Sequence, residues 1–260
     1  MKRILTVILL ALSCSACGVM GQINWDSPQM QQAATAALTA ASINDNQIAL
    51  LSREAVAQMD AQNKLADEKY QQRLARLMNG INDVEGLKIN YKVYQTNEVN
   101  AFACGDGSIR VYSALMDIMD DDELMAIIGH ECGHVVHKDT KKAMKNAYLT
   151  YAARYALGST GGTIGALSMS ALGDIGQAFV SSQYSQKQEF AADDYGYKFS
   201  TEHGCSPYSM ARALDKLVQL AGGKQASSVQ KMFSSHPDSA ERAQRMRQKA
   251  DAAAASKKKQ

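Results

Sequence analysis

The five residues His130 to His134 read His-Glu-Cys-Gly-His, and this short run carries the clearest chemical signal in the chain. On an α-helix, side chains four residues apart share one face and lie about 6 Å apart along the axis. Two neutral imidazoles at that spacing can bind one Zn²⁺ ion. Glu131 lies beside them, where its carboxylate can act as general base toward a water molecule. The run therefore predicts a catalytic zinc helix with one Zn²⁺ per chain.

The residues around this run indicate that it lies on a helix. Asp120 can cap the first turn, and the acidic residues after it place negative charge at the positive end of the helix dipole. Apolar side chains recur at helical spacing on both sides of the run, at Leu124, Ile127, Ile128 and Val135. A chance match is the alternative for so short a motif, and this context argues against it.

A third metal ligand is expected from a second helix. Residues 184–203 have a helical pattern that ends before Gly204, and they place Glu189 and Asp193 four residues apart on one face. Glu189 can bind the metal, while Asp193 can accept the second ring N–H of a metal-binding histidine and so orient it. The alternative is an acidic pair that simply faces solvent.

His-Glu-x-x-His followed by Glu-x-x-Ala-Asp resembles metallopeptidase family forty-eight, a group of gluzincins. The likeness covers roughly residues 65 to 250. It includes the segments Asn100–Ala103, Gly105–Gly107, Ile109–Leu115, His236-Pro237 and Ala240–Arg242. The resemblance implies an α+β fold, in which a mainly helical zincin-like domain carries a small β-sheet beside the metal helix. It also implies hydrolysis of peptide bonds.

This resemblance suggests how a peptide would be cleaved. An extended substrate would add as a strand beside the edge formed by Asn100, Ala101, Phe102 and Ala103, which explains broad specificity because the grip is on the backbone. Glu131 would take a proton from water and pass it to the leaving amine. His236 would donate to the oxyanion. Alternatively, the His236-Pro237 pair is structural, and Arg242 pairs with an internal acid.

Three positions near the motif differ from the family pattern or have no assigned role in it. Asp139 stands where members often have a histidine, five residues after His134. His137 is expected near the metal face or at the surface, without binding the ion. Cys132 lies 200° around the helix from His130, so we expect it to point into the protein.

The N-terminus predicts export and a lipid anchor. Met1–Arg3 and the apolar run Ile4–Leu12 form a short signal peptide. Ser15–Cys17 resembles a lipobox with Cys17 as the lipidated residue, and Cys14 is the weaker candidate. Gly18 is not the aspartate that retains lipoproteins in the inner membrane, so the periplasmic face of the bacterial outer membrane is expected. An ordinary cleaved secretory signal is the alternative.

The net charge limits the classes of binding partner, and the cysteine count limits the possible disulfides. Without Lys2 and Arg3 the basic count falls from 28 to 26, which equals the 26 acids. Nucleic-acid binding therefore has no electrostatic support. The expected partners are unfolded polypeptides as substrates, the membrane through the lipid anchor, and envelope proteins. Cys104, Cys132 and Cys205 could form at most one disulfide, whose pairing is open.

Composition divides the chain into segments. These are a signal peptide and lipobox (1–17), a tether (18–30), one metallopeptidase domain (31–255) with a helical N-terminal part (31–80) and a catalytic core (81–250), and a basic tail (256–260). Strands are expected within 87–96, 99–104 and 109–112, and helices over 143–157, 166–181, 184–203, 207–221 and 238–253. The uncharged run 155–173 predicts a helical hairpin near the cleft, as a mobile lid or as core packing.

A different class of function fits parts of the same sequence. A chaperone or adaptor lipoprotein of outer-membrane assembly could carry a structural or vestigial zinc site, or an intact but latent one. Structural zinc sites usually have four ligands, often cysteines, whereas this pattern supplies three and leaves one position open. Glu131 also favours catalysis, since a structural site has no use for a base.

Overall fold

The computed structural model describes residues 43–156, 169–223, 226–237 and 239–257. The elements, in chain order, are α3 (Asp45–Gln62), α4 (Glu68–Leu77), β1 (Asp83–Val84), β2 (Leu87–Lys88), β3 (Asn90–Tyr94), β4 (Ala101–Ala103), β5 (Ser108–Tyr112), α5 (Ser113–Ile118), α6 (Asp121–Val136), α7 (Asp139–Ala156), α8 (Met169–Val180), α9 (Gln186–Glu202), α10 (Ser209–Ala221), α11 (Ala226–Ser235) and α12 (Ser239–Lys257). The expected signal peptide, Cys17 and the tether lie outside the described residues.

Three strands form the main sheet, in the order β3-β5-β4. β3 runs parallel to β5, and β4 runs antiparallel to it at the sheet edge. The turn into β5 requires glycine at Gly107, because its φ is +88° and a Cβ there would overlap the carbonyl oxygen of Lys88. β1 and β2 form a separate hairpin. The expected small sheet is therefore present, with β4 as an edge strand.

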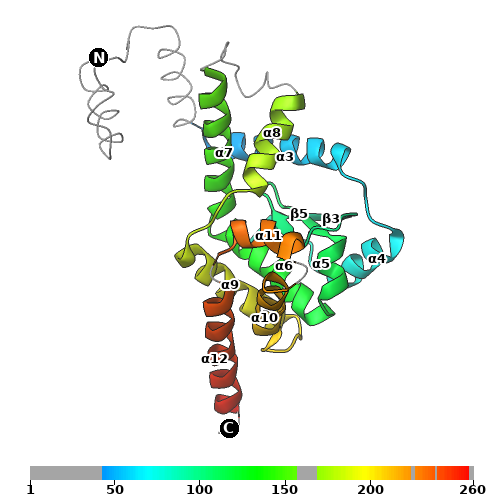
Figure 1. Cartoon of the computed structure of the whole chain (residues 1–260), viewed down its shortest axis with the longest axis vertical. Helices are drawn as coiled ribbons and strands as arrows, with labels where there is room; N and C mark the ends of the chain where they lie inside the picture. The colour runs from blue at the N-terminus through cyan, green and yellow to red at the C-terminus, as the bar shows by residue number, and fades with distance from the viewer. Residues whose placement is uncertain (1–42, 157–168, 224–225, 238, 258–260) are drawn as a thin grey trace, which may run out of the picture.

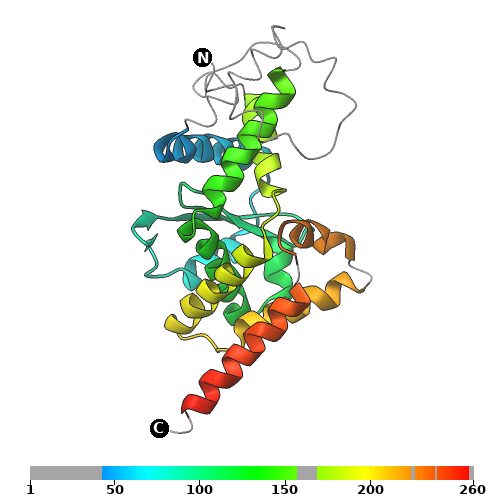
Figure 2. The same ribbon diagram turned by 90° about the vertical axis from the view of Figure 1, so that its left-hand side faces the viewer.

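Helices cover both faces of this sheet (Figure 1, Figure 2). Side chains alternate along a strand, so neighbouring residues enter different cores. Phe102 and Tyr112 pack into a core with α3, α7 and α8, whereas Ala101, Ala103 and Val111 pack into a core with α5 and α6. The mainly helical α+β architecture expected from sequence is confirmed, and it holds β4 beside α6.

α6 and α9 pack unusually close because glycines line their contact. A Cβ at Gly196 would lie 2.7 Å from the carbonyl oxygen of Ala126, and one at Gly129 would lie 2.8 Å from the Phe199 ring. At Gly133 it would lie 3.0 Å from the Ala192 Cα. Any side chain at these positions would push the helices apart. The glycines therefore set how near α9 comes to the metal helix.

The helix predictions hold with shifts at the ends. α7 begins four residues earlier than expected, and α11 was not expected, since its small polar residues gave a weak signal. α7 and α8 pack against each other and against α3. Most of the run 155–173, in which a hairpin was expected, lies outside the described residues. Cys104, Cys132 and Cys205 are free thiols. Among the described residues, no helix has the length and apolar character needed to cross a membrane.

Candidate metal centre

α6 carries the predicted zinc motif into the protein interior. Asp120 caps the helix and forms a capping box with Glu123, as the acidic run predicted. His130 and Glu131 are each 2% exposed, and His134 is fully buried. Cys132 is buried on the opposite side, in the core with α5, as expected. The helix therefore displays the two imidazoles and the carboxylate toward one buried point.

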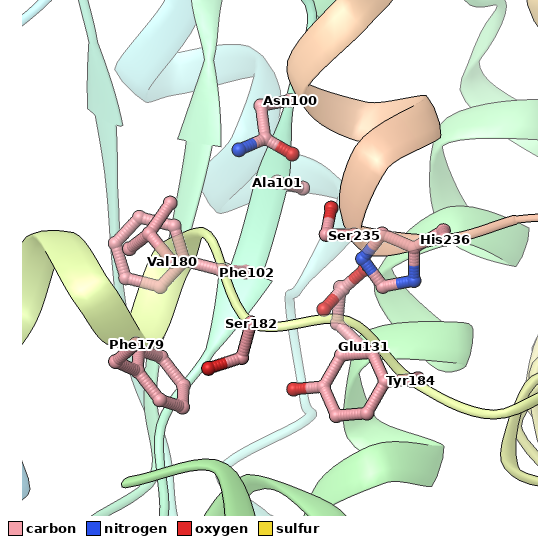
Figure 3. Close-up of a pocket in the computed structure, with 10 residues that line it drawn as sticks. All are labelled: Asn100, Ala101, Phe102, Glu131, Phe179, Val180, Ser182, Tyr184, Ser235 and His236. Atoms are coloured by element: carbon pink, nitrogen blue, oxygen red, sulfur yellow. The ribbon is translucent and has the colours of Figure 1, made fainter. Parts of the chain in front are cut away.

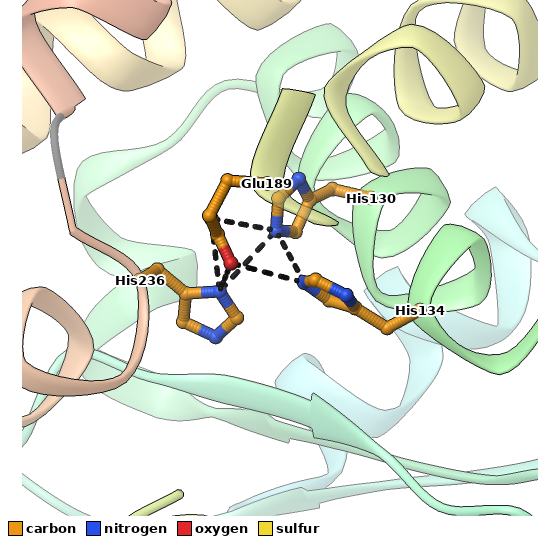
Figure 4. A group of neighbouring side chains, drawn as sticks. All are labelled: His130, His134, Glu189 and His236. Carbon is orange, nitrogen blue, oxygen red and sulfur yellow. Dashed lines mark hydrogen bonds and ion pairs between the residues drawn. The ribbon is translucent and has the colours of Figure 1, made fainter. Parts of the chain in front are cut away.

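Four side chains meet at that point (Figure 4). They are His130, His134, Glu189 and His236, and their donor atoms all lie within 4.8 Å of one another. Nε2 of His130 lies 3.2 Å from Nε2 of His134 and 3.3 Å from Nδ1 of His236. Oε1 of Glu189 lies 3.3 Å from Nε2 of His134 and 3.1 Å from Nδ1 of His236. All four residues are buried.

These separations fit a zinc ion. Ligand atoms at about 2.0–2.1 Å from a tetrahedral Zn²⁺ lie about 3.3–3.4 Å from each other. Five of the six residue pairs have separations of 3.1 to 3.6 Å, and all the donor atoms lie within 4.8 Å of one another. A set of three imidazole nitrogens and a carboxylate oxygen is also a donor set that zinc prefers. The predicted ligands His130, His134 and Glu189 are thus brought together, and His236 joins them.

Asp193 and Arg242 support this cluster from behind. Nδ1 of His130 lies 2.9 Å from Oδ1 of Asp193, so its proton can go to the carboxylate while Nε2 faces the cluster. Arg242 donates to both carboxyl oxygens of Asp193, at 2.8 and 2.7 Å, and its Nη1 lies 2.5 Å from Oε2 of Glu189. Asp193 takes the orienting place predicted for it. Arg242 pairs with internal acids, which was the structural alternative.

Burial and charged neighbours shift the pKa values of the cluster in opposite directions. Burial opposes ionisation of Glu189, but the charge of His236 and hydrogen bonds from the histidines outweigh it and lower its pKa. Burial likewise opposes protonation of His134, yet hydrogen bonds to Asp139 and Glu189 raise its pKa to about 9. Burial lowers the pKa of His130. The pKa of Asp193 is lowered to about 2, because Arg242 outweighs burial.

Glu131 faces a small cavity between the metal centre and the sheet edge (Figure 3). Its Oε1 is buried and accepts no hydrogen bond within the described part of the chain, and it lies 3.7 Å from Nε2 of His236. A buried carboxylate oxygen without a partner is costly unless a ligand or water serves it. The cavity is lined by Asn100, Ala101, Phe102, Glu131, Phe179, Val180, Ser182, Tyr184, Ser235 and His236.

Comparison with known proteins agrees with this geometry. Residues 64–250 match the model of peptidase family M48. The chain belongs to peptidase family M48. It is 43% identical over 248 residues to the metalloprotease LoiP of Escherichia coli K12, covering 94% of this chain and 96% of the relative. It is 37% identical to the metalloprotease YcaL of the same strain, over 93% and 96%. The protease HtpX homolog of Thermococcus sibiricus is 25% identical over 72% and 77%.

Membership in family M48 makes the chain a metalloprotease and confirms the resemblance read from its motifs. The structure adds contacts at the centre that the motifs do not reveal. Tyr184 stacks on the His134 ring, with centroids 3.9 Å apart and planes at 14°. Asp139 and Gln188 lie behind the same ring. His137 caps α6 at its C-terminus and contacts Tyr195 edge-on, outside the ligand group.

Proposed function

We propose that this M48 metalloprotease is a zinc-dependent endopeptidase of the bacterial cell envelope that hydrolyses unfolded or misassembled proteins for quality control. One observation supports this most directly. Glu131 presents a carboxylate oxygen that has no hydrogen-bond partner among the described residues, between the four-donor cluster and the edge strand β4. That is the place where a peptide carbonyl and an attacking water would have to meet.

His130, His134 and Glu189 would hold the zinc. When bound, Zn²⁺ acts as a Lewis acid toward the peptide carbonyl and the attacking water. Asp193 fixes the proton of His130 on Nδ1 and leaves Nε2 free as a ligand. Glu131 accepts the proton from water and returns it to the leaving amine.

The edge of β4 can bind an extended chain. The carbonyl of Asn100 accepts from Tyr112 N–H, and Cys104 N–H donates to the carbonyl of Ser108. In an antiparallel ladder the backbone groups of alternate residues face opposite sides. Ala101 and Ala103 therefore turn their N–H and C=O groups away from β5, where a substrate strand could pair with them. Such pairing uses hydrogen bonds to the substrate backbone, which every sequence has, and so supports activity on many unfolded proteins.

His236 has two possible roles at this site. The prediction from sequence makes it the donor to the oxyanion. Its Nδ1, however, lies among the ligand atoms, where it would occupy the fourth position that catalysis needs open. This placement favours a latent state and lends weight to the alternative of an adaptor or chaperone with little proteolysis. His236→Ala separates the roles, because activity rises if the ring closes the site and falls if the ring is a donor.

The test of the function uses full-length protein loaded with one Zn²⁺. Glu131→Gln should keep zinc and melting temperature but lose cleavage of reduced, unfolded casein by about 10³-fold or more, because the base is gone while the ligands remain. Glu202→Gln, an exposed change on α9, is the matched control and should cleave like wild type. Equal cleavage by Glu131→Gln would overturn the mechanism. Binding of casein without cleavage by either protein would favour the adaptor.

The proposed location rests on the N-terminal pattern. Cys17→Ser should remove the acyl chains and release the protein from the membrane fraction, because a short lysine tail binds lipid only weakly. Cleavage of an unfolded substrate should survive. Cys14→Ser is the control and should remain with the membrane. A Cys17→Ser protein that still sediments with the outer membrane would contradict anchoring at Cys17, and fatty-acid labelling of both variants would identify the acylated residue.

A further inference from the structure

Asp193 contacts the ring of His130, and Asp139 contacts the ring of the second metal-binding histidine, His134. Asp139 is 2% exposed at the start of α7, and its Oδ2 lies 3.3 Å from Nδ1 of His134. The other ring nitrogen, Nε2, faces His130 and Glu189. Asp139 therefore stands to His134 as Asp193 stands to His130. A carboxylate in this position selects the tautomer that leaves Nε2 free for a metal.

The second oxygen of Asp139 is tied to α9 through Gln188. Nε2 of Gln188 donates to Oδ1 of Asp139 at 2.7 Å. Oε1 of the same amide accepts from the backbone N–H of Ser185 at 2.9 Å and from its hydroxyl at 2.7 Å. Because the amide oxygen must face the N–H of Ser185, the NH₂ group must face Asp139. The capping box of α9 thus fixes the direction of this donor.

The backbone between α6 and α7 is bent to bring Asp139 under the ring. Lys138 has φ +61°, a left-handed conformation that is uncommon for a residue with a side chain. This bend lets Asp139 return toward His134 only five residues along the chain. Lys142 approaches Asp139 at 3.7 Å but is 69% exposed, so Gln188 is the firmer partner. An uncommon conformation next to a site indicates that its geometry matters there.

We propose that Asp139 and Gln188 form a positioning bridge that orients His134 and ties it to the first turn of α9, so that Glu189 meets it at the metal. This inference rests on the proposed zinc site. Glu189 directly follows Gln188, so a hydrogen bond from Gln188 to the α6–α7 junction limits how far Glu189 can drift from His134. The two metal-binding histidines are then braced differently. Asp193 is held by the Arg242 guanidinium, and Asp139 by a neutral amide.

The experiment measures zinc affinity by competition with a chelator, together with the melting temperature of the zinc-free protein. Gln188→Glu keeps the capping box, since glutamate suits that position, but replaces the donor to Asp139 with a second carboxylate. Asp139→Asn removes the charge beside His134. Each variant should lower zinc affinity about 10–100-fold, as losses of such outer partners typically do. Gln183→Glu adds the same charge five residues earlier at an exposed position and should bind zinc like wild type.

The double variant gives the sharpest test. With Asn at 139 and Glu at 188, the amide and the carboxylate have exchanged places, so an N–H···O contact can form again in the reverse direction. Its zinc affinity should exceed that of Gln188→Glu alone, yet stay below wild type because His134 then faces a neutral acceptor. A bridge with only a structural role would lower the melting temperature of the zinc-free protein and show no such recovery in affinity.

Three results would overturn the bridge. One is unchanged zinc affinity in both single variants. Another is a loss of zinc affinity that is fully explained by a lower stability of the zinc-free protein. The third is a double variant no better than Gln188→Glu. Wild-type protein that binds no zinc would instead overturn the metal site itself, so the two failures are distinguishable.

Discussion

Two clusters of charged side chains, one partly and one fully buried, look similar in composition and differ in how their donors and acceptors are arranged. In the first, Asp60 on α3 accepts hydrogen bonds from Lys92 at 2.7 Å, Tyr94 at 2.6 Å and Arg110 at 2.8 and 3.0 Å. In the second, the metal centre, three imidazole nitrogens and an oxygen of Glu189 lie within 4.8 Å of one another. In the first cluster every donor points at Asp60. In the second, Arg242 pairs with Glu189 and Asp193 from behind, while the ligand atoms converge on one point.

This difference separates a structural cluster from a functional one. A buried carboxylate stabilises a fold only when donors satisfy it, as Arg110 satisfies Asp60. A cluster whose imidazole nitrogens and carboxylate oxygen converge on one point is stabilised further by a bound cation, so its stability depends on metal binding. The composition of a buried charged cluster therefore says little until the direction of each donor and acceptor is known.

The largest expected effect follows from breaking the first cluster, the one around Asp60. Arg110→Met should lower the free energy of unfolding by about 3–5 kcal/mol, because it removes two charge-assisted hydrogen bonds from a buried guanidinium to the partly buried Asp60 carboxylate. The loss should be equal with and without zinc, measured by denaturant unfolding. Arg76→Met changes an exposed ion pair with Asp121 and is the matched control, expected within about 1 kcal/mol of wild type. A loss that vanished on adding zinc would contradict the separation of the two clusters.

The second expected effect concerns the metal centre. Glu189→Ala should lower zinc affinity by more than the 10–100-fold expected of Asp193→Ala, because the first removes a ligand and the second an orienting partner. Chelator competition gives both affinities. Zinc should raise the melting temperature of wild type far more than that of Glu189→Ala. Equal zinc occupancy of wild type and Glu189→Ala at limiting metal would place the third ligand elsewhere.

The smallest effect is a pH dependence that belongs to the first cluster. Burial opposes ionisation of Asp60, but hydrogen bonds from Arg110, Lys92 and Tyr94 lower its pKa to about 2. A carboxyl whose folded pKa lies below its unfolded value of about 3.9 stabilises the fold above that value and loses this contribution as the pH falls toward 2. The stability difference between wild type and Asp60→Asn should stay constant from about pH 5 to 8 and shrink below about pH 4. Parallel stability curves down to pH 2 would contradict it.

The sequence predicted the metal ligands better than their surroundings. The face shared by His130 and His134 follows from helical periodicity alone, and Glu189 could be proposed because few acids follow the helix in a comparable pattern. The helix predicted over 184–203 contains Gln188, but nothing local shows that its amide reaches Asp139. Tyr184 gave no signal either, because stacking on His134 depends on how the chain between α8 and α9 crosses the site.

His236 shows the same limit. Its pairing with Pro237 and the spacing to Arg242 marked the segment as part of the site, and the structure places it there. Which ring nitrogen faces the ligands, and therefore whether the ring donates or closes the centre, depends on where α11 ends. α11 itself was not foreseen from its small polar residues.

The sequence by itself determined what lies within one helix or one turn. The pairing of His130 with His134 and the cap at Asp120 are local consequences of helical periodicity and hydrogen bonding. Only the tertiary structure decided that Glu189 and His236 meet those histidines, because the distance from α9 to α6 is set by the glycines at 129, 133 and 196 fitting against each other's helix. That fit involves residues 59 to 70 positions apart, and no local pattern in the sequence records it.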